Sequence, residues 1–180
     1  MRKYLIVISL IIELFTLANC KKKEEVASVQ SDSKIETTIT GLSGNKYSLA
    51  LPKGWKMVDG FESINPDNDF LYESPDGFRL IAVISELKTD FVDFDTYVDL
   101  VSKDIESSDQ KPIFKDLENF KGKETEYTAI IRGRNFKYIE YIIETDKNFM
   151  QLYSWSYVSN FDEAKSELVS IMDSFHVVDE

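Results

Sequence analysis

Three long segments in the second half of the chain alternate apolar and polar residues. They cover residues 124–131, 136–144 and 149–157. Alternation with a period of two is typical of strands that bury one face. The residues between the segments, Arg132-Gly133-Arg134-Asn135 and Asp146-Lys147-Asn148, suit hairpin turns. The sequence therefore predicts three successive antiparallel strands here.

The rest of the domain mixes shorter strands with two helices. Strands are predicted at 47–51, 70–73 and 80–87, and strand patterns resume at Ile113. A helix with Asp93 as N-cap is predicted from residues spaced by three and four, and a final helix is expected to begin after Asn160 as N-cap. The apolar stripes of the two helices are Phe94, Tyr97, Val98, Val101 and Ile105, and Phe161, Ala164, Leu168, Ile171, Met172 and Phe175. This order predicts an α+β fold with a mainly antiparallel sheet packed with helices.

The N-terminus has the organisation of a bacterial lipoprotein signal peptide. Arg2 and Lys3 precede an apolar stretch at 5–17, which is too short to cross a bilayer but suits a secretory signal. The residues 17–20, Leu-Ala-Asn-Cys, resemble the lipobox, in which the cysteine is acylated and becomes the mature N-terminus. Asn19 departs from the usual Gly or Ala, and Glu13 is unusual in an apolar stretch. The alternatives are a secreted protein with an incidental thiol at Cys20 and an uncleaved anchor.

Three parts of the chain follow from this interpretation. Residues 1–19 are the expected cleaved signal peptide, residues 20–33 a flexible charged tether, and residues 34–180 the globular domain. Acyl chains on Cys20 would hold the protein to a membrane, with the outer membrane of the cell envelope as the expected location. The run Lys-Lys-Lys-Glu-Glu after Cys20 resembles the export tag of surface lipoproteins of the Bacteroidota, so display at the surface and orientation toward the periplasm both remain open.

Three segments of the domain resemble the PsbP/Mog-like family, which includes DcrB-like bacterial lipoproteins. They are LPKGW at 51–55, YESPDGFRLIAV at 72–83 and LVSIMDSF at 168–175. The resemblance implies an α/β/α sandwich over nearly the whole domain. It also implies a protein that binds other proteins and has no enzymatic activity.

Composition and motifs argue against several kinds of chemistry. The formal net charge of −11 disfavours nucleic acid as a partner, and one cysteine allows neither an intramolecular disulfide nor a cysteine-based zinc site. With His176 as the lone histidine, we expect no catalytic residues, no metal and no cofactor. Asp67-Asn68-Asp69 lacks the glycine and the third oxygen ligand of a calcium loop, so we interpret it as a solvated turn.

Aromatic residues offer the one candidate binding face. Tyr153, Trp155 and Tyr157 alternate on one side of a predicted strand, where they could stack on a sugar or hold an apolar peptide. The same stripe would arise if this side packed beneath a helix. Because the opposite side carries Leu152, Ser154 and Ser156 and is less apolar, we expect the aromatic side to be the buried one.

Two functional hypotheses follow. The first is a non-catalytic, membrane-anchored lipoprotein whose domain binds an envelope protein partner or assists assembly. The second is an envelope lipoprotein that binds a glycan or another small ligand, with or without hydrolysing it. The first predicts an exposed apolar patch, whereas hydrolysis requires a cleft with two carboxylates about 5–10 Å apart.

Overall fold

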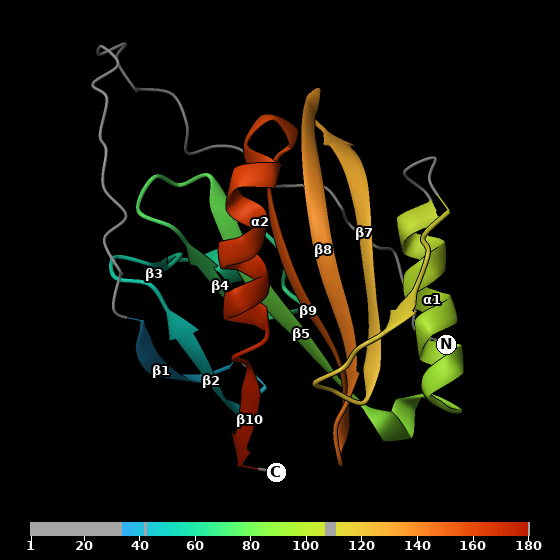
Figure 1. The fold of residues 1–180 in the computed structure, drawn as a ribbon. Coiled ribbons are helices and arrows are strands. Elements are labelled where there is room, and N and C mark those ends of the chain that lie inside the picture. Colours follow the sequence, from blue (N-terminus) through green and yellow to red (C-terminus); the bar gives the residue numbers. More distant parts are fainter. Residues whose placement is uncertain (1–33, 42, 107–110, 180) are drawn as a thin grey trace, which may run out of the picture.

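The computed structural model describes residues 34–41, 43–106 and 111–179. In this part of the chain, ten strands form two antiparallel sheets, and two α-helices pack around them (Figure 1). The strands are β1 (Ile35–Thr40), β2 (Lys46–Leu51), β3 (Lys56–Met57), β4 (Asn68–Glu73), β5 (Arg79–Leu87), β6 (Lys115–Asp116), β7 (Gly122–Ile131), β8 (Arg134–Glu144), β9 (Asn148–Tyr157) and β10 (His176–Asp179). The helices are α1 (Phe94–Glu106), α2 (Val158–Met172) and the short 3-10 helices η1 (Phe61–Ser63) and η2 (Lys88–Asp90). The α+β class with a mainly antiparallel sheet is confirmed.

The larger sheet has seven strands in the order β3-β4-β5-β9-β8-β7-β6. The three long strands predicted from alternation are β7, β8 and β9, and each pairs with the next in antiparallel register. Arg132 and Gly133 form the two-residue turn between β7 and β8, with φ angles of 50° and 75°. Two left-handed residues give the turn a twist that matches the twist of the flanking strands, which fixes this hairpin.

The smaller sheet has three strands in the order β1-β2-β10. Only β2 was expected from the sequence, because the polar run IETTIT of β1 and the four residues of β10 carry little alternation. The final strand brings the end of the chain back against β2, where His176 lies opposite Ser48. The two sheets and α2 enclose the main hydrophobic core.

Both helices form where the sequence predicts them, but one boundary differs. The Asp93 Oδ1 accepts a hydrogen bond of 2.8 Å from the Thr96 backbone N–H, so its predicted role as N-cap of α1 is confirmed. The prediction that Asn160 caps α2 is wrong, because β9 runs directly into a helix that already begins at Val158. Phe175 is buried as expected but lies beyond the end of α2.

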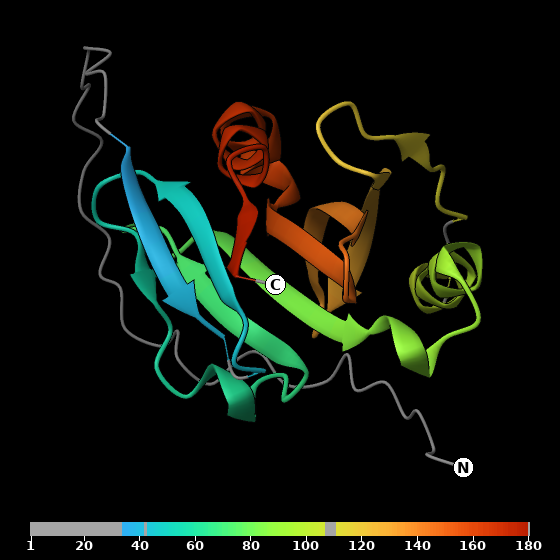
Figure 2. The same ribbon diagram turned by 90° about the horizontal axis from the view of Figure 1, so that it is seen from below.

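The two helices pack on opposite faces of the large sheet. Figure 2 shows α2 over one face beside the small sheet, and α1 at the far end near β6 and β7. We call the first the α2 face; its side chains include Ile81, Val83, Ile139, Tyr141, Leu152 and Ser154. We call the second the α1 face; its side chains include Tyr127, Tyr138, Glu140, Ile142, Phe149, Tyr153, Trp155 and Tyr157.

Candidate functional site

The predicted aromatic stripe lies on the α1 face. Trp155 is 3% exposed, as expected for core, whereas Tyr153 and Tyr157 are half-buried. The expectation that the aromatic side is the buried one of the two is wrong, because the opposite side is buried more completely. There Ser154 is fully buried beneath α2 and donates to the Met172 sulfur at 3.0 Å. A small serine side chain fits at position 154 because the larger side chains of α2 fill the space above it.

Four aromatic rings form a continuous stack across three strands of this face. Tyr127 stacks on Tyr138, Tyr138 on Trp155, and Trp155 on Tyr153, with centroid separations of 5.0, 5.6 and 5.4 Å and interplanar angles of 2°, 20° and 17°. Rings that stack on each other cover each other's flat faces. The inner rings therefore present edges to the outside, so the stack is poorly suited to hold a sugar ring.

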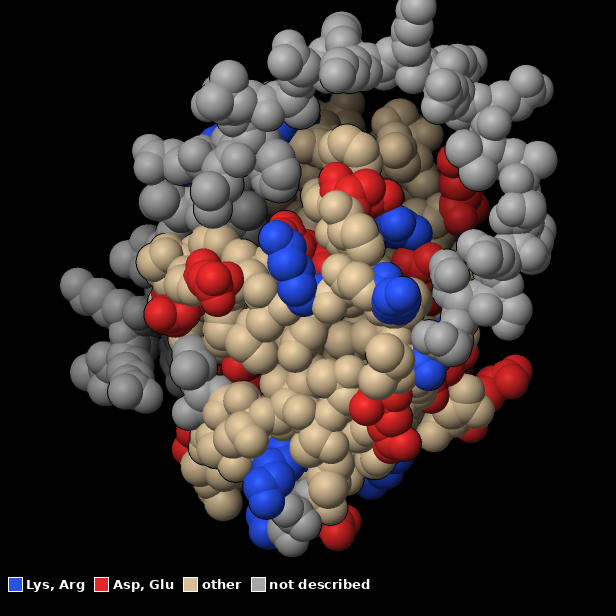
Figure 3. All heavy atoms as spheres, turned by 90° about the vertical axis from the view of Figure 1, so that its left-hand side faces the viewer, with Lys and Arg blue, Asp and Glu red and all other residues tan. Residues whose placement is uncertain are grey.

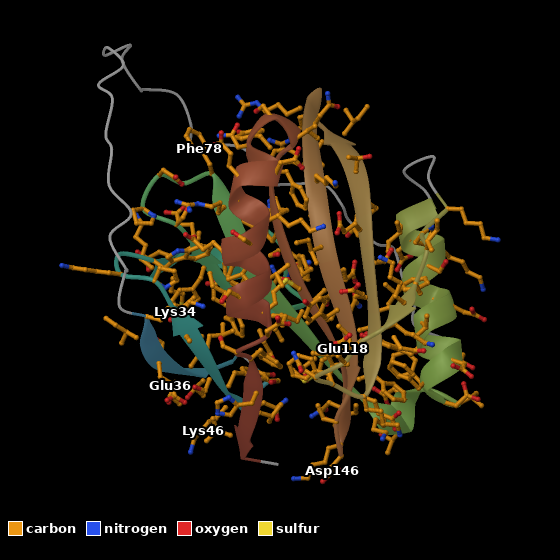
Figure 4. The ribbon with its side chains drawn as sticks, viewed as in Figure 1. Lys34, Glu36, Lys46, Phe78, Glu118 and Asp146 are labelled. Atoms are coloured by element: carbon orange, nitrogen blue, oxygen red, sulfur yellow. The ribbon has the colours of Figure 1, made fainter. Side chains whose placement is uncertain are left out.

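The aromatic face reaches the surface at one end of the sheet. There Tyr157 stacks on Phe136 at 4.8 Å and meets the edge of Phe78 at 5.9 Å, and Phe78 is 44% exposed. Arg134 Nη1 donates to the Tyr157 hydroxyl at 2.9 Å. We call Phe78, Phe136 and Tyr157 the aromatic corner. Figure 4 shows Phe78 at the opposite end of the molecule from Lys46 and Asp146.

Farther along the same face lies a buried glutamate that sequence reasoning missed. Glu140 is 3% exposed, and its Oε2 accepts a hydrogen bond of 3.0 Å from the Tyr127 hydroxyl. Within the described part of the chain, neither its Oε1 nor the buried Oγ1 of Thr125 on the neighbouring strand has a hydrogen-bond partner. Burial raises the pKa of Glu140 to about 7, the bond from Tyr127 opposes this shift, and the charge of Asp104 adds to it. In the sequence, the signal for this buried site is a single acid, Glu140, between the apolar residues Tyr138 and Ile142 on the same side of β8.

A hollow of about 340 Å³ lies at the N-terminal end of α1. Its lining consists of Lys88, Val92, Asp93, Phe94, Asp95, Glu144 and Phe149. Ion pairs with Lys121 at 2.8 Å and Lys88 at 2.6 Å lower the pKa of Glu144, and hydrogen bonds from Thr96 lower that of Asp93. A glycoside hydrolase needs one carboxyl that keeps its proton near neutral pH, and the lowered pKa values of Glu144 and Asp93 are opposite to that requirement.

The segment 67–69 is not the solvated turn that we expected. Asp67 is exposed, but Asn68 and Asp69 belong to β4 and are buried. Asp69 accepts hydrogen bonds from the Ser43 N–H at 2.7 Å, from the Ser43 hydroxyl at 2.6 Å and from the Tyr47 hydroxyl. Burial, together with this bond to Asp69, raises the pKa of Tyr47 to about 12. The carboxylate thus fastens the β1–β2 hairpin to the large sheet.

The remaining candidates lie at the surface or outside the described residues. His176 is exposed, with its Nε2 at 3.8 Å from the Glu36 carboxylate. Across residues 34–41, 43–106 and 111–179, no cluster of His, Cys, Asp and Glu is arranged to hold a metal ion, and no helix has the length and apolar character to cross a membrane. On the side that carries β1 and β3, acidic and basic groups are interspersed over a largely uncharged surface (Figure 3). Cys20, the signal peptide and the tether lie outside the described ranges.

Comparison with solved structures identifies the fold. No protein-family model and no curated protein matches the sequence. The Ran-binding protein Mog1p of Saccharomyces cerevisiae matches with a TM-score of 0.54 at 11% identity, over 82% of this chain and 97% of Mog1p. LpqN, involved in cell envelope biogenesis of Mycobacterium tuberculosis, matches with a TM-score of 0.53 at 9% identity, over 79% of this chain and 90% of LpqN.

A protein from Bacteroides thetaiotaomicron also matches, with a TM-score of 0.51 at 10% identity over 83% of this chain. The match covers 50% of the Bacteroides protein, so this chain corresponds to half of that relative's length. At these identities the likeness shows the fold alone. The PsbP/Mog1-like fold expected from the sequence is confirmed.

Proposed function

We propose that the protein is a non-catalytic, lipid-anchored protein of the bacterial cell envelope whose domain binds an envelope protein or assists its assembly. Its fold is shared with Mog1p, described as Ran-binding, and with LpqN, described as involved in cell envelope biogenesis. The lipobox-like residues at 17–20 support the anchor. The aromatic corner is the observation that carries the proposal of protein binding.

The aromatic corner has the composition of a protein-binding anchor. An exposed Phe78 beside a half-buried Tyr157 offers rigid apolar surface, which partners bury at the centre of an interface. Arg134 is adjacent and, within the described part of the chain, forms no ion pair. Its guanidinium has further donors for a carboxylate. We therefore expect a partner that presents an apolar side chain next to an acidic one.

Site-specific photocrosslinking in intact envelopes tests this proposal. A photoreactive phenylalanine at position 78 should crosslink one protein, and an Arg134→Glu substitution in the same chain should strongly reduce the product. Position 87 is the control, because Leu87 is also apolar and exposed but lies at the other end of β5. Equal products from positions 78 and 87 would exclude the aromatic corner as the binding surface.

The hollow beside α1 favours the second hypothesis, in which the domain binds a glycan or another small ligand. Phe94 and Phe149 provide apolar surface there, and the charged groups of its lining could orient hydroxyls. An NMR titration with soluble peptidoglycan and lipopolysaccharide fragments distinguishes the two sites. Shifts around Phe149 would support ligand binding in the hollow, and their absence at millimolar fragment would exclude it for these glycans.

We also propose the division of the chain into a cleaved signal peptide at 1–19, a tether at 20–33 and a domain at 34–180, with acylation at Cys20. Cys20→Ser should abolish labelling with a palmitate analogue and move the protein from the membrane to the soluble fraction. Asn19→Ala is the matched control, because it restores a usual lipobox residue and should leave the protein in the membrane. Membrane retention of Cys20→Ser would disprove the lipid anchor. Protease treatment of intact cells then separates surface from periplasmic exposure.

A further inference from the structure

The strongest unexplained feature is the position of Glu140 between the large sheet and α1. Thr125 lies opposite it on β7 and Tyr153 opposite it on β9. The Tyr127 side chain, which bonds Glu140, also packs against the cluster formed by α1 residues with Ile142 and Phe149. The carboxyl group is therefore buried from solvent next to the contact between α1 and the sheet.

Among the residues that the structure describes, the groups around Glu140 offer no cation to balance an ionised carboxylate. Asp104 on α1 is near enough for its charge to raise the pKa of Glu140, and Glu86 on β5 interacts with Tyr97 in the same region. Lys123 on β7 is the nearest basic residue in register on this face, and its Nζ is held by the Asp116 carboxylate at 2.6 Å. The other polar groups that face this region are neutral: Thr125, Tyr97, Tyr127, Tyr138, Tyr153 and Gln151.

The helix above Glu140 is itself acidic. Its sequence FDTYVDLVSKDIE contains four acids and one lysine. Its buried contacts with the sheet come from Tyr97, Val101 and Ile105, which pack against Ile142 and Phe149, and Phe94 also contacts Phe149. Asp104 belongs to the C-terminal half of α1, where the helix dipole is negative. A negative charge on Glu140 would thus meet the negative end of a negatively charged helix.

We propose that α1 is a proton-controlled cover of the sheet, which stays docked while Glu140 carries a proton and is released when Glu140 ionises. A buried carboxylate without a cationic partner requires hydration. Release of α1 hydrates Glu140 and leaves the α2 side of the sheet intact. Release also uncovers the apolar side chains of Ile142 and Phe149.

The direction of the pH dependence follows from the raised pKa of Glu140. Because the pKa of Glu140 is raised when α1 is docked, the docked state holds the proton more tightly than the released state. Docking is therefore strongest below the ordinary carboxyl pKa and weakens as the pH rises toward about 7. From an ordinary value of 4.5 and a docked value of about 7, the opening equilibrium should increase roughly tenfold between pH 6 and pH 8.

Hydrogen exchange on the intact domain, corrected for the intrinsic effect of pH, tests the proposal. In the wild type, protection of the amides of α1 should fall roughly tenfold between pH 6 and pH 8, while protection of α2 stays constant. Glu140→Gln cannot ionise and should remove the pH dependence in α1. Glu36→Gln is the control, because Glu36 is exposed on the small sheet and its loss should preserve the wild-type pattern.

Three results would overturn the proposal. They are constant protection of α1 in the wild type, a parallel loss in α1 and α2, and the same pH dependence in Glu140→Gln as in the wild type. The last result would indicate another acid, such as Glu86. If Glu140→Gln does not fold, the comparison of α1 with α2 in the wild-type protein still decides between local release and global unfolding.

Discussion

The two faces of the large sheet bury their side chains in different ways. On the α2 face, one continuous apolar cluster joins both sheets to α2, and buried polar groups such as Ser154 and Tyr141 find partners in Met172 and Asp173. On the α1 face, the buried apolar residues form two clusters, which share the half-buried Tyr127 and have Thr125 and Glu140 between them. A continuous and satisfied interface favours one rigid arrangement, whereas a divided interface with unsatisfied groups permits a second one. We infer that the α2 face carries most of the stability and the α1 face is the adaptable side.

The largest expected effect on the free energy of unfolding comes from making the same substitution, leucine to alanine, in each of the two helices. Leu168 of α2 is fully buried in the continuous cluster, whereas Leu100 of α1 is 43% exposed. Leu168→Ala leaves a cavity in a core that cannot close around it, so it should lower the free energy of unfolding by about 3 kcal/mol. Leu100→Ala should change it by less than about 0.5 kcal/mol. Urea denaturation measures both values, and similar losses would contradict the assignment of stability to the α2 face.

This contrast also shows what the sequence can predict. The strands β7, β8 and β9 were predicted well because alternation depends only on each strand's own side chains. The burial of the β9 side that α2 covers was not predicted. Ser154 and Ser156 are not apolar, and they are buried because larger residues of α2 pack over them. Small residues under a large-residue helix and polar residues at a surface give the same local pattern.

The polar sites were hidden for a related reason, since their partners are distant in the sequence. Asp69 was assigned to a turn from its neighbours, but its donors come from Ser43 and Tyr47, which are 26 and 22 residues away. Glu140 stands in a strongly apolar strand, and only the approach of α1 makes its burial evident. The stacked row of rings likewise depends on the register among three strands.

The next prediction concerns the polar group that holds the small sheet on the α2 side. In Asp69→Asn, an amide group replaces an oxygen that accepts from the Ser43 or Tyr47 donors, so two donors would face each other in a buried site. The loss should be about 2 kcal/mol in the free energy of unfolding. Asp67→Asn, at an exposed position two residues away, should have almost no effect. Equal effects in urea denaturation would mean that Asp69 does not anchor the hairpin.

The smallest expected effect is that of replacing a threonine with valine, which should change the free energy of unfolding in opposite directions at Thr125 and Thr145. The Thr125 hydroxyl is buried on the α1 face without a partner in the described part of the chain, so Thr125→Val removes an unsatisfied group and keeps the shape. This change should raise the free energy of unfolding by about 1 kcal/mol.

Thr145 provides the matched comparison at the β8–β9 turn. Its hydroxyl accepts from the Asn148 N–H at 3.0 Å and donates to the Asn148 carbonyl at 3.1 Å, so Thr145→Val should lower the free energy of unfolding by about 1 kcal/mol. If Thr125→Val is instead destabilising by a similar amount, the Thr125 hydroxyl has a partner in solution. The α1 face would then be satisfied like the α2 face, and the contrast between the two faces would rest on Glu140 alone.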